Sequence, residues 1–152
     1  MKYCPPQKNS KGFTLIELLV VIGILAILLS IVLIAINPAR QFGQANDTQR
    51  KSNVTAILNA IGAYAADNKG LLPAGIPTAP TAAVDVGTTS ICSAILNTYI
   101  SAIPTDPSLN TAAITDCTLS PATNYMVVKD ANNRITVSAP NAEITTPISI
   151  TR

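Results

Sequence analysis

The feature that most constrains this chain is an unbroken apolar segment near its N-terminus. Residues 13–36 read FTLIELLVVIGILAILLSIVLIAI, with a single charged side chain, Glu17. As an α-helix this segment would span roughly 36 Å, which is enough to cross the hydrocarbon core of a bilayer. A helix of a soluble domain rarely runs this long without a polar face. The segment therefore predicts a membrane-spanning helix.

The residues around the start of this segment distinguish it from a secretory signal peptide. A signal peptide has a shorter apolar stretch with its cleavage site on the far side. Here the basic residues Lys2, Lys8 and Lys11 come first, and the composition changes at Gly12, before the apolar stretch. Glu17 is unusual because a carboxylate at bilayer depth is costly, although near a helix end it can reach the interface and is favoured by the helix dipole. The charge alone therefore leaves its role open.

The stretch KGFTLIELLVVIGILAILL, residues 11–29, resembles the cleavage and methylation signature of type IV pilins and pseudopilins. The resemblance implies that a prepilin peptidase cleaves between Gly12 and Phe13 on the cytoplasmic side, and that Phe13 is then N-methylated. It also implies that Glu17 neutralises the Phe13 ammonium of a neighbouring subunit in a filament. Physical chemistry agrees, because a carboxylate among apolar helices is disfavoured unless a positive charge faces it, and a methylated amine keeps its charge.

The resemblance further implies where the protein resides and what it contacts. The precursor, with leader 1–12, would lie in the inner (cytoplasmic) membrane with an extracytoplasmic head, and the filament would lie at the cell surface or in the periplasm. The partners would be the prepilin peptidase and methylase, an inner-membrane assembly platform, membrane lipid before assembly, and identical subunits in a helical filament. Nucleic acid is not expected, because without the leader the chain has seven basic side chains against eight acidic ones.

Residues 37–70 predict an amphipathic continuation of the helix, which would then run from Phe13 to Asn68. Pro38 and Gly43 are expected to kink or locally melt it near the membrane exit, and Gly70 can cap its end. The buried face should carry the apolar residues that recur at helical spacing: Val54, Ile57, Leu58, Ile61 and Ala65.

The polar residues of this continuation are expected to face solvent. Asp47 precedes Arg50 by three positions and Lys51 by four, and opposite charges at these spacings attract modestly on an exposed helix face. Asn59 and Gly62 also read as ordinary helix surface.

Residues 71–152 predict a globular head. Prolines recur through residues 71–121, which we expect to form a variable loop with one short helix around Ile91–Ile100. Residues 125–129 and 135–138 predict a β-hairpin around a turn at 130–133. Residues 144–151 predict a third strand, placed at an edge because Pro147 cannot donate a hydrogen bond.

The expected fold class is therefore α+β and type IV pilin-like. A long N-terminal helix, with a membrane half at 13–36 and an amphipathic half at 37–70, packs on a small antiparallel β-sheet head.

Cysteine usage is consistent with an exported head. Cys4 lies in the leader, so Cys92 and Cys117 remain once residues 1–12 are removed. In an extracytoplasmic domain this pair predicts a disulfide, worth about 3 kcal/mol if unstrained. Two buried thiols are the alternative.

The sequence predicts neither an enzyme nor a cofactor-binding protein. It contains no histidine, no Gly-rich phosphate loop, and no companion ligands that would turn two cysteines into a zinc site. The segment 99–107 (YISAIPTDP) resembles the loop of the major pseudopilin of type II secretion that approaches a calcium site, so Asp106 and Asp116 are the calcium candidates. The alternative is an ordinary turn at Asp106, because Asp-Pro is common in turns and the carboxylates are not clustered.

Three functions follow, in order of preference. The first is a structural subunit of a type IV pilus-like filament, polymerised through residues 13–36. The second is the major pseudopilin of a type II secretion or DNA-uptake system, which residues 99–107 favour, whereas a disulfide-bracketed loop favours a pilin head. The third is a single-pass membrane-anchored adhesin, for which the placement of Gly12, Phe13 and Glu17 would be coincidence.

Overall fold

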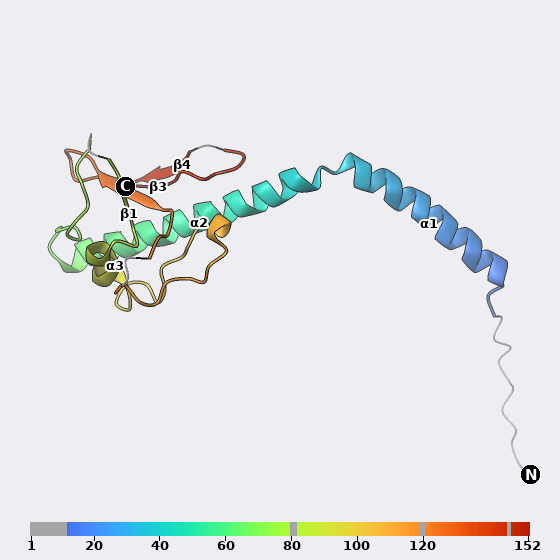
Figure 1. Cartoon of the computed structure of the whole chain (residues 1–152), viewed down its shortest axis with the longest axis horizontal. Coiled ribbons are helices and arrows are strands. Elements are labelled where there is room, and N and C mark those ends of the chain that lie inside the picture. Colours follow the sequence, from blue (N-terminus) through green and yellow to red (C-terminus); the bar gives the residue numbers. More distant parts are fainter. Residues whose placement is uncertain (1–11, 80–81, 119–120, 146) are drawn as a thin grey trace, which may run out of the picture. The chain divides into compact units, whose positions relative to one another are not determined.

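The computed structural model of the chain describes residues 12–79, 82–118, 121–145 and 147–152 (Figure 1). Apart from Gly12, the expected leader at 1–12 lies outside the described residues. The chain divides into two compact units, one ending at Pro38 and one comprising Ala39–Arg152. Each unit is considered by itself.

The first unit contains helix α1, Leu15–Ala35. Thr14 is its N-cap, and Thr14 and Glu17 form a reciprocal capping box, which satisfies backbone N–H groups that the helix leaves free at its start. Helix α1 has a mean hydropathy of 3.3 and no buried residue. Among the described residues it is the one helix that is long and apolar enough to cross a membrane.

The sequence predicts one helix from Phe13 to Asn68, kinked or locally melted at Pro38 and Gly43, and the disturbance at Pro38 is confirmed: it divides the stretch into two helices. Residue Ile36 is extended, with φ −91° and ψ 120°, and helix α2 begins at Pro38 and runs to Asp67. Proline disfavours helical backbone at the preceding residue and has no N–H to continue the hydrogen-bond ladder, which explains a break directly before Pro38. The helix continues through Gly43, the second position where the sequence predicts a disturbance.

Helix α2 ends as its sequence predicts, at Asp67, next to Asn68. The backbone N–H of Gly70 donates to the carbonyl of Ala65 at 2.8 Å, and Gly70 has a φ of 86°. A positive φ costs glycine little, so this residue closes the helix with a C-terminal cap.

The head contains a four-stranded antiparallel sheet in the order β1-β2-β3-β4. The expected hairpin is confirmed: β2 (Met126–Lys129) pairs with β3 (Ile135–Ala139), with Val127 opposite Val137. The expected edge strand is also confirmed, although β4 (Ile148–Thr151) begins later than predicted, directly after Pro147.

Strand β1 (Val84–Asp85) lies in a segment that the sequence predicts to be loop, so that prediction is wrong there. Two residues carry too little periodicity to identify a strand. The side chain of Asp85 stabilises the strand by accepting hydrogen bonds from the backbone N–H groups of Gly87, Thr123 and Asn124.

Side chains of α2, the sheet and helix α3 (Thr89–Ile95) contribute to the core, and Figure 1 shows the sheet and α3 beside α2. Helix α3 is shorter than the expected Ile91–Ile100, because Asn97 adopts a φ of 65°, which ends helical geometry. A short 3₁₀ turn, η1, follows at Pro107–Leu109. Fully buried apolar side chains of the core include Val54, Ile57, Ile61, Ile91, Ile95, Val127 and Val137.

Candidate functional site

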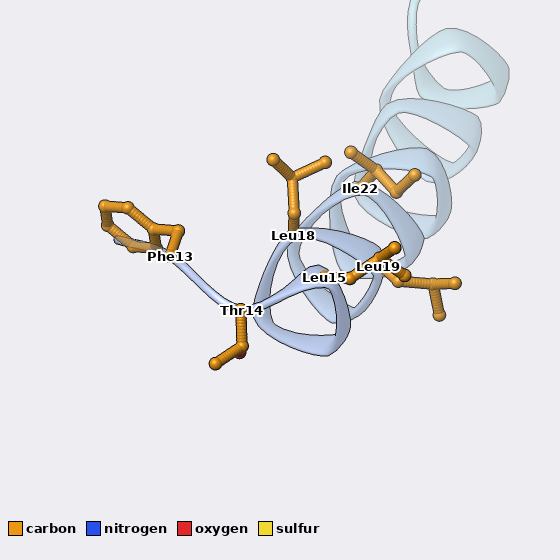
Figure 2. A pocket seen from close by; sticks show the side chains of 6 residues that line it. All are labelled: Phe13, Thr14, Leu15, Leu18, Leu19 and Ile22. Atoms are coloured by element: carbon orange, nitrogen blue, oxygen red, sulfur yellow. The ribbon is translucent and has the colours of Figure 1, made fainter. Parts of the chain in front are cut away.

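Gly12 and Phe13, between which cleavage is expected, are exposed just before the start of α1. A Cβ atom added at Gly12 would have no neighbour within 4 Å, and Phe13 is 87% exposed. Figure 2 shows Phe13 extending from the segment before the helix, with Leu18 and Ile22 following one turn apart along α1. Together with Thr14, Leu15 and Leu19 they line a shallow apolar depression of about 350 Å³.

Glu17 is held by its own N-cap. The backbone N–H and the hydroxyl of Thr14 donate to Glu17 Oε2 at 3.1 and 2.8 Å, and the Glu17 N–H donates to Thr14 Oγ1 at 3.3 Å. These contacts lie within one chain, so the expected pairing of Glu17 with a neighbouring Phe13 ammonium stays a prediction. They do fix the carboxylate close to the position where that ammonium would be generated, because Phe13 directly precedes Thr14.

The remainder of α1 is an apolar surface on all sides. No residue of the helix is buried, and each of its large apolar side chains is at least half exposed. An apolar surface this extensive is not stable in water, so it must be covered by lipid or by other helices. The geometry fits both a membrane anchor and a packing surface for identical helices.

In the head, the expectation that Asp47 and Arg50 face solvent is wrong. The Arg50 side chain is fully buried. Its Nε and Nη2 donate to the two carboxylate oxygens of Asp106 at 2.9 and 3.0 Å, and its Nη1 donates to Asp47 at 3.0 Å and to Glu143 at 3.1 Å. Pairing with Asp106 raises the pKa of Arg50 above its usual range, although burial opposes the shift. We call Arg50, Asp47, Asp106 and Glu143 the Arg50 cluster.

Helical spacing explains why Arg50 is buried. Arg50 precedes Val54 by four residues and Ile57 by seven, so it lies on the same face of α2 as the apolar core residues. The sequence therefore contains the signal for burial, although the i, i+3 spacing from Asp47 taken alone favours an exposed pair. Buried charges occur where they are paired and hydrogen-bonded, as they are here.

Asp47 binds a second segment of the head through its carboxylate. The backbone N–H groups of Glu143, Ile144 and Thr145 donate to it at 2.9, 2.8 and 3.1 Å. Burial would raise the pKa of Asp47, but these three N–H donors and Arg50 outweigh burial and lower the pKa to about 2. The carboxylate is therefore ionised at neutral pH and holds the segment on α2.

A further polar contact continues this row along α2. The side-chain amide of Asn53 donates to the hydroxyl of Tyr125 at 2.8 Å, and both residues are buried. Asn53 follows Arg50 by three residues, so polar residues on one helix face bind different segments of the head.

The two calcium candidates lie in different settings. Asp106 is 1% exposed and binds Arg50 with both oxygens, while it also accepts from the backbone N–H of Ser108 as the cap of η1. Arg50 and Ser108 lower the pKa of Asp106 although burial opposes them. Asp116 is exposed and accepts from the backbone N–H of Thr118. Among the described residues, no three His, Cys, Asp or Glu side chains are grouped to hold a metal ion.

Cys92 and Cys117 form a disulfide, as the cysteine count predicts. Their Cα atoms are 5.7 Å apart, and the bridge joins α3 to the far end of the segment that carries Asp106. The disulfide and the Arg50–Asp106 pair therefore hold the same loop at two points.

Comparisons with known proteins show what the sequence resembles. The family model of the prokaryotic N-terminal methylation motif matches residues 7–33, which include Gly12, Phe13 and Glu17. The type IV wide pilus major component PilA4 of Thermus thermophilus is 37% identical over 104 residues, which cover 61% of this chain and 72% of that protein. No solved structure matches this chain.

Proposed function

Since this chain belongs to the type IV pilin family, we propose that it is the structural subunit of a type IV pilus-like filament, made as a prepilin and polymerised through α1. The observation that carries the proposal is one charged residue, Glu17, in an apolar helix that has no buried residue and begins at Leu15, two positions after Phe13.

Processing is the first step of the proposed function. A prepilin peptidase cleaves between Gly12 and Phe13 on the cytoplasmic side and the new amino group of Phe13 is methylated. The exposure of both residues and the start of the helix at Leu15 support this step, because the scissile bond then lies in non-helical, accessible backbone.

Assembly is the second step. The Phe13 ammonium of one subunit pairs with Glu17 of its neighbour as the α1 helices pack, so both charges are compensated when they leave the lipid interface. Thr14 keeps the Glu17 carboxylate at the end of the helix until the ammonium reaches it. The partners are the prepilin peptidase, an inner-membrane assembly platform, lipid before assembly, and identical subunits afterwards.

The precursor accordingly lies in the inner membrane with its head, residues 71–152, outside the cytoplasm. The similarity to a major pilus component supports a surface filament. The pseudopilin alternative, with a periplasmic filament, has its support in residues 99–107. Electron microscopy of sheared surface fractions, probed with antibody to the head, separates the two: surface fibres support a pilus, and periplasmic material alone supports a pseudopilus.

The experiment that tests the proposal is intact and N-terminal mass spectrometry of the protein from its native membrane or surface fraction. A chain that begins at methylated Phe13 is expected. A chain that still begins at Met1 in cells with an active prepilin peptidase would contradict the proposal. The Gly12→Ala variant should remain unprocessed, and its full maturation would show that the peptidase does not read this residue.

The role of Glu17 has its own test. Glu17→Val should be inserted and cleaved normally but should assemble poorly, because the neighbouring ammonium loses its counter-charge. Val20→Ile is the matched control, since it alters an apolar α1 side chain without changing charge. Normal fibre yield from Glu17→Val would refute the pairing.

A further inference from the structure

The first turns of α2, residues 38–46, contact a distant segment of the head. Seven of these residues are exposed, including Phe42 at 70%. The two that are not exposed, Gly43 and Asn46, both lie against residues 142–145, which we call the strap. The Asn46 side-chain amide donates to Glu143 Oε1 at 2.9 Å, and Ile144 lies over Gly43.

The strap is attached through Asp47, at the end of these turns. Three successive strap N–H groups, those of Glu143, Ile144 and Thr145, donate to the Asp47 carboxylate, and the Glu143 side chain accepts from Arg50. The core of the head begins further along α2, at Val54. Ala142, the first residue of the strap, belongs to the apolar core, whereas residues 143–145 contact α2 before the core residues of that helix begin.

The sequence of residues 38–46 is weak as an isolated helix. It contains Gly43 and Asn46, both poor helix formers, and the first turn has no acidic residue to offset the helix dipole. Short helical segments are marginal in water unless tertiary contacts stabilise them. The strap supplies that contact.

Gly43 shows how closely the strap approaches. A Cβ atom at this position would lie 3.2 Å from both Glu143 Oε2 and Ile144 Cδ1. Glycine in a helix interior is less stabilising than alanine. At position 43 its lack of a side chain leaves space for the side chains of Glu143 and Ile144. Gly62, on the same helix, has nothing within 4 Å of the equivalent atom.

We propose that the strap is a releasable clasp: docked, it keeps residues 38–46 helical, and released, it lets these turns unfold while the core of the head stays folded. Unfolding would lengthen this stretch from roughly 14 Å to roughly 30 Å, which gives the segment between α1 and the core a reserve of length. The clasp goes beyond the proposed function, because it acts within one subunit whether or not the subunit polymerises.

Hydrogen exchange of the full chain in detergent micelles at neutral pH, followed residue by residue, tests the clasp. In Asp47→Ala the amides of residues 42–47 should exchange at least about tenfold faster, because three strap N–H groups lose their acceptor. The amides of residues 57–61 and of strands β2 and β3 should stay more strongly protected than residues 42–47 in both the parent chain and the variant, because they open only when the whole head unfolds. Alanine has a higher helix propensity than aspartate, so residues 42–47 would exchange more slowly in this variant if their helix did not depend on the strap.

A further variant makes the test independent of Asp47. Glu143→Ala alters the strap and leaves α2 unchanged, and it should speed exchange of the same amides by a smaller factor. Gly62→Ala, a control in α2 with open space around the added methyl group, should leave residues 42–47 unaffected.

Two outcomes would overturn the clasp. If strap amides exchange faster in Asp47→Ala and Glu143→Ala while residues 42–47 do not, the helix does not depend on the strap. If residues 42–47 are as strongly protected as the core amides in the parent chain and open only together with them, the strap belongs to the global fold and is not separately releasable.

Discussion

Arg50 and Asp106, 56 positions apart in the sequence, bind each other inside the head through two hydrogen bonds of 2.9 and 3.0 Å. One residue is on α2 and the other caps η1, within the loop that the Cys92–Cys117 disulfide closes. The pair therefore connects the helix that follows the membrane segment to the most irregular part of the head.

Arg50→Met should destabilise the head strongly. The substitution preserves much of the side-chain volume but leaves the buried carboxylates of Asp106 and Asp47 without their cation, which costs about 3–5 kcal/mol of unfolding free energy for a buried pair. Urea denaturation of the full chain in detergent, followed by circular dichroism, measures the loss.

Arg134→Met is the control for Arg50→Met. Arg134 binds Asp130 at 2.7 Å, but its side chain is 64% exposed. Because water can replace this contact, Arg134→Met should lose little unfolding free energy. Equal losses of unfolding free energy in the two variants would contradict the view that the Arg50 pair is important for stability because it is buried.

Stability should fall in acid through Asp47. The folded pKa of Asp47 is about 2, below its ordinary value of 3.8, because the strap N–H groups and Arg50 outweigh burial. A depressed folded pKa contributes stability that is present above the unfolded pKa and is lost as pH falls toward the folded one. Denaturation midpoints measured from pH 5 down to about pH 2 should drop below about pH 4, and Asp47→Asn should flatten that drop. An identical acid profile for Asp47→Asn would exclude Asp47 as its source.

Loss of the disulfide should weaken the head without affecting processing. The bridge closes a loop between positions separated by 25 in the sequence, so Cys92→Ser/Cys117→Ser should lose about 3 kcal/mol of unfolding free energy. Thermal melting with and without reductant measures the effect, and the double variant should not respond to reductant. Cleavage after Gly12 should proceed as in the parent chain, because the two sites lie in different units.

Gly87→Ala should be among the most damaging small substitutions in the head. A Cβ at Gly87 would overlap the carbonyl oxygen of Pro121, so the backbone of one segment must move, at a cost of at least about 2 kcal/mol. Gly62→Ala, where the space is open, should stabilise α2 by roughly 1 kcal/mol. Melting temperatures that shift in the same direction in both variants would show that backbone crowding is not the cause.

Much of this molecule could be predicted because the signals are local. The apolar run of α1, the glycine cap after α2 and the alternation of β2 and β3 each depend on residues close together in the chain. Periodicity and capping act over a few residues, so the sequence alone determined that the chain has a long apolar helix, an amphipathic helix and a small antiparallel sheet.

The tertiary structure alone decided how the charged residues are used. Arg50 is three positions from Asp47, a spacing typical of an exposed pair, but its main partner is Asp106, and Asp47 takes three N–H groups of the strap. Such partners are set by which loops fold onto α2, and each loop is positioned by the whole core. Strand β1 also depends on a tertiary partner, since its two residues form a strand only because β2 lies beside them.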